Sequence, residues 1–177
     1  MTRDEFETAL EHLRQGNFTS LAPWFAPHAS LQGRSRVEAW LAAGRFGPFR
    51  EEALEALSCA AFLGADATLR ALLDQGLPAA GGSASGMGAL HYAASRGRVS
   101  SVRLLLERGA PLEARNQYGG TALAQTVWSA LHEPMPGQRE ALELLLAAGA
   151  ELGAVEVPTG DVAIDALLAR ASDARRR

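Results

Sequence analysis

The sequence repeats itself at an interval of 33 residues, and this repeat constrains the fold more than any other feature. The eight residues that start at Leu57 align without a gap with those that start at Leu90, and a third copy starts at Leu123. Two glycines, Gly76 and Gly109, keep the same spacing. A fixed period of this length indicates stacked supersecondary units, because a single unit cannot bury its own apolar face.

Each unit is predicted to be a pair of short helices. The first helix carries a Leu-x-x-Ala-Ala pattern, as in residues 90–94, and is broken by a glycine. The second helix carries three apolar residues at fixed positions before its terminal glycine: Leu69, Leu72 and Leu73 before Gly76; Val102, Leu105 and Leu106 before Gly109; Leu142, Leu145 and Leu146 before Gly149. This spacing places the three side chains on one helical face. Helices this short are marginal alone in water, so neighbouring units must stack.

Composition favours a helical protein and excludes several other classes. Aromatic residues make up 6% of the chain and β-branched residues are scarce, which disfavours a large sheet. The single cysteine, Cys59, excludes an intramolecular disulfide framework and a thiolate zinc site. Residues 1–7 are polar and acidic, and no run of apolar residues is long enough to cross a membrane. We therefore expect a cytoplasmic protein without a signal peptide or membrane span.

The clearest unit reads GMGALHYAA over residues 86–94 and LLERGA over residues 105–110, and the next unit opens with NQYGGTAL over residues 116–123. In these residues the chain resembles the ankyrin-repeat family, whose units carry Asp or Asn, Gly, Thr-Pro-Leu-His, Ala-Ala, and then Leu-Leu and Gly-Ala. Gly88 and Ala89 replace the family's Thr and Pro, so a looser start to that helix is expected. The resemblance implies an all-α fold, an α-solenoid of helix-turn-helix units with hairpin-like loops, with about four repeats and a C-terminal capping helix.

We expect a single domain over residues 1–172. Its predicted parts are a degenerate capping repeat (4–31), an inserted helix (32–50), repeats at 51–83 and 84–116, a repeat with a seven-residue insertion (117–156), and a capping helix (157–172), followed by a disordered basic tail (173–177). The capping repeat is inferred from Leu21, Trp24 and Phe25, which precede His28 as the other triplets precede their glycines.

The insertion is placed near residues 131–137. Leu123 and Gly149 are 26 residues apart, whereas the equivalent residues of the other units are 19 apart. The insertion is either a tolerated surface segment or an added binding loop. We expect valine to be tolerated at Gly137 and poorly tolerated at Gly109, where a positive φ is predicted.

The sequence offers no recognisable catalytic or cofactor-binding set. The four histidines have no helical metal-ligand spacing, and the resemblance implies that His91 bridges backbone groups of neighbouring repeats. Cys59 is interpreted as a small packing residue. The glycine-rich residues 81–86 lack the ending of a phosphate-binding loop and are interpreted as a flexible fingertip between repeats. We therefore expect no enzyme activity, no cofactor and no metal.

The leading functional hypothesis is a non-catalytic module that binds a partner protein or peptide on its concave face. One alternative is a regulator or immunity-type inhibitor that occludes a specific enzyme, and another is an enzyme of unknown type. Nucleic acid is not expected as a partner, because the net charge is −3 and aromatic residues do not alternate with the basic ones. The protein is expected to be a monomer.

The family resemblance places nine residues on the concave face: Phe62, Leu63, Met87, Ser95, Arg96, Arg115, Gln117, Tyr118 and Trp128. Tyr118 and Trp128 are the candidate anchors for the partner, since large exposed side chains tend to mark interfaces. Arg96 and Arg115 are the candidates for selecting an acidic segment beside them. The alternative is that Phe62, Leu63 and Trp128 turn inward, or are covered by residues 35–44 and the insertion.

Overall fold

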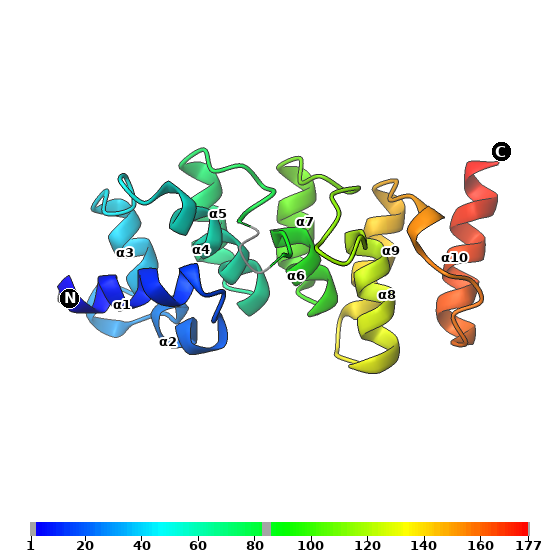
Figure 1. The fold of residues 1–177 in the computed structure, drawn as a ribbon, viewed down its shortest axis with the longest axis horizontal. Helices are drawn as coiled ribbons and strands as arrows, with labels where there is room; N and C mark the ends of the chain where they lie inside the picture. The colour runs from blue at the N-terminus through cyan, green and yellow to red at the C-terminus, as the bar shows by residue number, and fades with distance from the viewer. Residues whose placement is uncertain (1–2, 83–85, 177) are drawn as a thin grey trace.

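The computed structural model describes residues 3–82 and 86–176, and over these residues it contains helices and loops but no strand (Figure 1). The α-helices are α1 (Arg3–Arg14), α2 (Ala22–Phe25), α3 (Arg36–Ala42), α4 (Arg50–Leu63), α5 (Asp66–Asp74), α6 (Ala89–Ser95), α7 (Val99–Glu107), α8 (Ala122–His132), α9 (Gln138–Ala147) and α10 (Val162–Arg175). Short 3-10 helices occur at η1 (Thr19–Leu21), η2 (Ala29–Leu31) and η3 (Leu152–Ala154). The predicted all-α solenoid is confirmed.

The helices form two rows along the length of the molecule (Figure 1). In the first row α1, α4, α6 and α8 pack side by side, and in the second row α3, α5, α7, α9 and α10 do so. The pairs α4–α5, α6–α7 and α8–α9 also pack across the two rows. The core lies between the rows, where the first two apolar residues of each second-helix triplet are buried: Leu69, Leu72, Val102, Leu105, Leu142 and Leu145 are all at most 1% exposed. The third residues Leu106 and Leu146 are half-buried.

The repeated glycines end the second helices of the pairs. Gly76, Gly109 and Gly149 follow α5, α7 and α9 closely and have φ values of 81°, 75° and 99°. Residues with side chains resist this left-handed conformation, which explains why glycine recurs there. Side chains cap the starts of α3, α8 and α10: the oxygens of Ser35, Thr121 and Asp161 accept hydrogen bonds from backbone N–H groups in the first turns of these helices.

His91 links neighbouring repeats, as the family resemblance implies. Its Nε2 lies 3.1 Å from the carbonyl oxygen of Gly120 and donates a hydrogen bond to it. Burial lowers the pKa of this imidazole, and hydrogen bonds to the backbone at Gly120 and Ala114 oppose that shift. The ring therefore serves as a fixed bridge between repeats.

The N-terminal end differs from the three regular pairs. α1 takes the first-row position beside α4, but α3 rather than α2 lies beside α5 in the second row. The Ser35 hydroxyl, at the start of α3, lies 2.9 Å from that of Thr68 on α5 and joins the two helices. The predicted triplet of the capping repeat falls on η1 and α2, where Leu21 and Phe25 are buried.

The insertion forms a loop that is fixed against the end of α6. Gln138 is 3% exposed; its Nε2 donates to the carbonyl oxygens of Ser95 and Glu133, and its Oε1 accepts from the N–H of Met135. Gly137 has a φ of 84°, and a Cβ atom there would collide with the carbonyl of Gly97. The expectation that Gly137 tolerates a side chain is therefore wrong, because the loop packs backbone against backbone at this point.

The C-terminal segment also differs from the expectation. α10 continues to Arg175, three residues beyond the predicted end of the capping helix. The Arg175 guanidinium donates a hydrogen bond to the carbonyl oxygen of Ala150, at 2.5 Å. The prediction of a disordered tail from residue 173 is therefore wrong for residues 173–175, which are helical. Arg177 and residues 83–85 of the predicted fingertip lie outside the described residues.

Candidate protein-binding surface

The exposed large apolar side chains gather near the C-terminal end of the array. Among the described residues they are Tyr118 (79% exposed), Trp128 (51%), Leu131 (37%), Val157 (59%) and Val162 (85%). The opposite end is covered by α1, whose outward side chains include Asp4, Glu7 and Glu11, while Phe6 and Leu10 face the core. The two ends of the array therefore present different chemistry to solvent.

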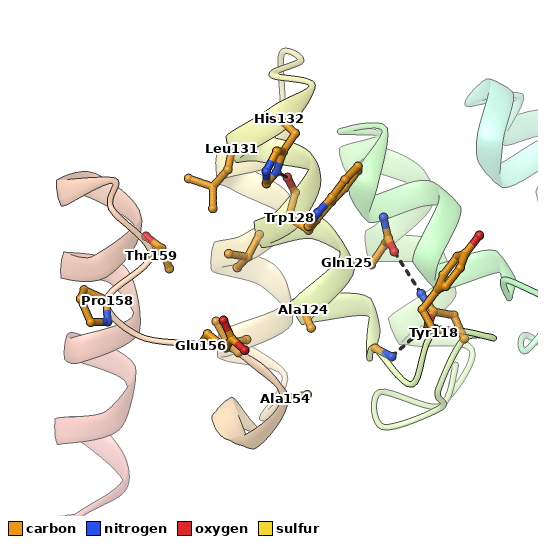
Figure 2. A pocket seen from close by; sticks show the side chains of 14 residues that line it. Tyr118, Ala124, Gln125, Trp128, Leu131, His132, Ala154, Glu156, Pro158 and Thr159 are labelled. Carbon is orange, nitrogen blue, oxygen red and sulfur yellow. Dashed lines mark hydrogen bonds between the residues drawn. The ribbon is translucent and has the colours of Figure 1, made fainter.

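The end of the first row explains this exposure. α8 packs against α6 on one side, but the next helix, α10, packs against α9 in the second row. Residues 155–160, which are not helical, stand where a further first-row helix would follow. They leave a groove of about 450 Å³ beside α8. Figure 2 shows its lining, from Tyr118 and Trp128 through Leu131 to Pro158 and Thr159.

Trp128 is held in place by its own helix. Its ring stacks on that of His132, one turn later, with a centroid distance of 4.6 Å and an interplanar angle of 17°. His132 Nδ1 also donates a hydrogen bond to the Trp128 carbonyl oxygen, at 2.8 Å. One face of the indole is thus covered inside the molecule, and half of the side chain remains available to a partner.

Tyr118 is presented by a loop with a defined conformation. The buried Asn116 accepts hydrogen bonds through Oδ1 from the N–H groups of Tyr118 and Gly120, at 3.0 and 2.9 Å. Its amide nitrogen donates to Oε1 of Gln125 on α8, at 3.0 Å. These bonds tie the loop to the groove wall, so Tyr118 can bind a partner with little loss of backbone entropy.

The nine predicted surface residues fall into separate environments. Arg115, Gln117, Tyr118 and Trp128 are exposed, Met87, Leu63, Phe62 and Arg96 are half-buried, and Ser95 is buried. Phe62 packs edge-on against Phe18 and Tyr92, with centroid distances of 5.9 and 5.6 Å. Phe62 and Leu63 belong to the packed interior edge of the array, so the structure does not bring them together with Tyr118 and Trp128 in one exposed strip.

Arg96 and Arg115 differ from Arg103 and Arg108 of the same repeat. Arg103 and Arg108 form ion pairs with Glu140 and Asp74, at 2.7 and 2.6 Å. The guanidinium of Arg96 instead lies 4.7 Å from the centre of the Phe62 ring. Arg115 donates to the carbonyl oxygen of Gly119, at 2.6 Å. Neither forms an ion pair with a carboxylate of the described residues, so both charges can meet an acidic group on a partner.

Sequence reasoning missed several groove residues, among them Gln125, Leu131, His132 and Glu156. The spacing of Trp128 and His132 at i and i+4 was a usable signal for a stacked pair. Glu156 could not be found in this way, because it reaches the groove only through the path of the final loop.

Three further features of the described residues bear on catalytic cysteine chemistry, metal binding and membrane insertion. Cys59 is buried, and burial raises the pKa of its thiol well above the usual range, which disfavours the reactive thiolate. Within residues 3–82 and 86–176, no three His, Cys, Asp or Glu side chains lie close enough together to hold a metal ion. No helix in the described part of the chain is long and apolar enough to span a membrane.

A family model described as ankyrin repeats in three copies matches residues 28–116 and, in an overlapping match, residues 57–156. The matches cover more than half of the chain, and the protein belongs to the ankyrin-repeat family. The crystal structure of EF0377, an ankyrin repeat protein, is similar with a TM-score of 0.49 and 18% identity, over 95% of this chain and 94% of that one. No curated protein matches the sequence.

Proposed function

We propose that this protein is a non-catalytic binding module that holds a partner protein or peptide in the groove beside α8. Ankyrin repeats are in general protein–protein interaction modules. The observation that carries the proposal is the exposure of Tyr118 and Trp128, two side chains of the types enriched at interface centres, at the rim of one groove.

Charge on the same face gives the partner a chemical character. Arg96 and Arg115 are without ion pairs among the described carboxylates; Arg96 directly follows α6, and Arg115 lies in the loop between α7 and α8. An acidic segment that extends from the groove toward α6 would pair with these two charges. Such pairs at the rim contribute mainly to specificity and to the association rate.

The test is a double substitution, Tyr118→Ala with Trp128→Ala. Both side chains are exposed, so the fold should remain intact, and binding should weaken by more than about 2 kcal/mol, as for paired hot-spot residues. The partner is first captured with the parent protein and its affinity is then measured by calorimetry.

Val157→Ala with Val162→Ala is the matched control, because both valines are exposed but neither lines the groove. This control should bind as the parent does. A partner that binds the Tyr118/Trp128 variant as tightly as the parent would show that the groove is not the binding surface.

A further inference from the structure

The occupant of the groove can be inferred from the molecule itself, because the array contains the same helix–helix contact in a completed form. Trp128 on α8 lies 66 residues, two repeat intervals, after Phe62 on α4. At Phe62 the next first-row helix, α6, covers the exposed side of the ring. The Tyr92 ring lies 5.6 Å from it, and the Arg96 guanidinium lies 4.7 Å from its centre. Tyr92 and Arg96 are one helical turn apart on α6.

At Trp128 this cover is missing. The chain passes the groove as the non-helical residues 155–160, and the tryptophan remains 51% exposed. The groove follows α8 from Ala124 to His132, which is about 12 Å at 1.5 Å per residue. This length matches roughly two turns of a neighbouring helix.

Along the α8 wall of the groove, backbone hydrogen bonding favours a helical over an extended occupant. The middle of α8 offers no free N–H or C=O groups, because a helix satisfies them internally. An extended peptide laid along α8 would bury its own backbone groups without partners, which is costly. A helix arrives with its backbone hydrogen bonds already made, so it meets the groove with side chains only.

The charge at the groove is consistent with a basic side chain on that helix. Glu156 lines the groove and is exposed, and Glu133 is exposed directly after His132. The N-terminal helix of a second copy of this chain would fit the groove poorly. Its outward side chains on α1 include Asp4, Glu7 and Glu11, whose negative charges would lie near those of Glu133 and Glu156.

From these observations we propose that the groove takes an amphipathic helix of the partner, with an aromatic and an arginine residue one turn apart, in the position that a further first-row helix would hold. The aromatic ring packs against Trp128 as Tyr92 packs against Phe62, and the arginine lies over the indole beside Glu156. This inference rests on the proposed function and specifies the conformation and side chains of the bound segment.

The probe is a hydrocarbon-stapled peptide that copies residues 86–98 of this chain, which contain the tyrosine and the arginine in the required spacing. Calorimetry should detect its binding to the full-length protein at concentrations below about 1 mM, a weak but specific affinity. Trp128→Ala should weaken binding at least about tenfold, as expected for loss of an anchor residue. Val162→Ala should change it less than about twofold, because this exposed valine lies outside the groove.

Two control peptides test the helix and its side chains. Replacing the tyrosine and arginine with alanine should weaken binding, and so should a proline in the centre of an unstapled copy, since proline breaks the helix. The inference is overturned if the stapled peptide does not bind, if Trp128→Ala leaves its affinity unchanged, or if the proline peptide binds equally well. Loss of the captured partner by the Tyr118/Trp128 variant, together with no stapled-peptide binding, would leave the proposed function standing and remove only the helical occupant.

Discussion

Which residue type fits at a position of this array depends on the backbone dihedral angle there and equally on how closely another backbone segment approaches. Gly109 and Gly137 both have positive φ, and conformation alone would rank them together. A Cβ atom added at Gly109 would have no residue beyond its chain neighbours within 4 Å. A Cβ atom added at Gly137 would collide with the carbonyl of Gly97. The two glycines therefore differ in their surroundings and not in their dihedral angles.

The expected outcome is that Gly137→Val destabilises the protein more than Gly109→Val. Gly109→Val should cost about 1–3 kcal/mol, the strain of a left-handed β-branched residue. Gly137→Val should exceed it by at least about 1 kcal/mol, because the loop must also move away from α6. Urea unfolding of both variants measures the difference, and equal losses would contradict the close contact seen between Gly97 and Gly137.

At the scale of elements, the array depends on side chains that carry hydrogen bonds between consecutive units. Gln138 begins α9 and yet bonds with Ser95 at the end of α6 and with the loop at Glu133 and Met135. The insertion is thus a structured part of the third regular repeat, and it directly follows the part of α8 that lines the groove.

We predict that Gln138→Ala destabilises the protein by about 1–3 kcal/mol, because it leaves buried backbone groups without partners. Gln15→Ala is the matched control: Gln15 is exposed, its side chain bonds only to Glu11 on the same helix, and its loss should stay within about 0.5 kcal/mol. Thermal or urea unfolding compares the two. A loss at Gln138 no larger than at Gln15 would mean that the loop contributes nothing to stability.

On the scale of the whole molecule, stability is shared along the rows. Each regular pair packs mainly against its neighbours, as expected for a solenoid, although the Tyr92 ring of α6 also reaches Phe18 in the N-terminal cap, at a centroid distance of 5.2 Å. The central pair, α6–α7, therefore supports both α4–α5 and α8–α9. It carries Leu90 on α6 and Leu105 on α7, which are 3% and 0% exposed.

Leu90→Ala and Leu105→Ala should each cost about 2–5 kcal/mol, the range for truncation of buried leucine. Because the damaged unit is central, amide exchange should accelerate in α4 and α8 as well as in α6 and α7. Val162→Ala, at an exposed site, should change stability by less than about 0.5 kcal/mol. Faster amide exchange confined to the mutated pair of helices would show that the repeats unfold independently.

The repeat, the helix pairs and the family could all be predicted from the order of the amino acids. Its signals are local: a leucine triplet and a terminal glycine recur at one interval, so the burial of Leu69, Leu105 and Leu142 and the left-handed Gly109 were predictable. The exposure of Tyr118 and Trp128 was also expected from the sequence, whereas their role in binding stays a prediction.

What covers each equivalent position of the repeat could not be predicted and became visible in the packed molecule. Phe62 and Trp128 share one place in the repeat, yet the first is covered by Tyr92 and the second is open. The same holds for α3, which takes the second-row place beside α5, and for Gly137, which meets Gly97 across a loop. Local patterns specify a helix and its buried face, but a neighbour distant in the chain determines which part of that face reaches solvent, because burial is a property of the assembled rows.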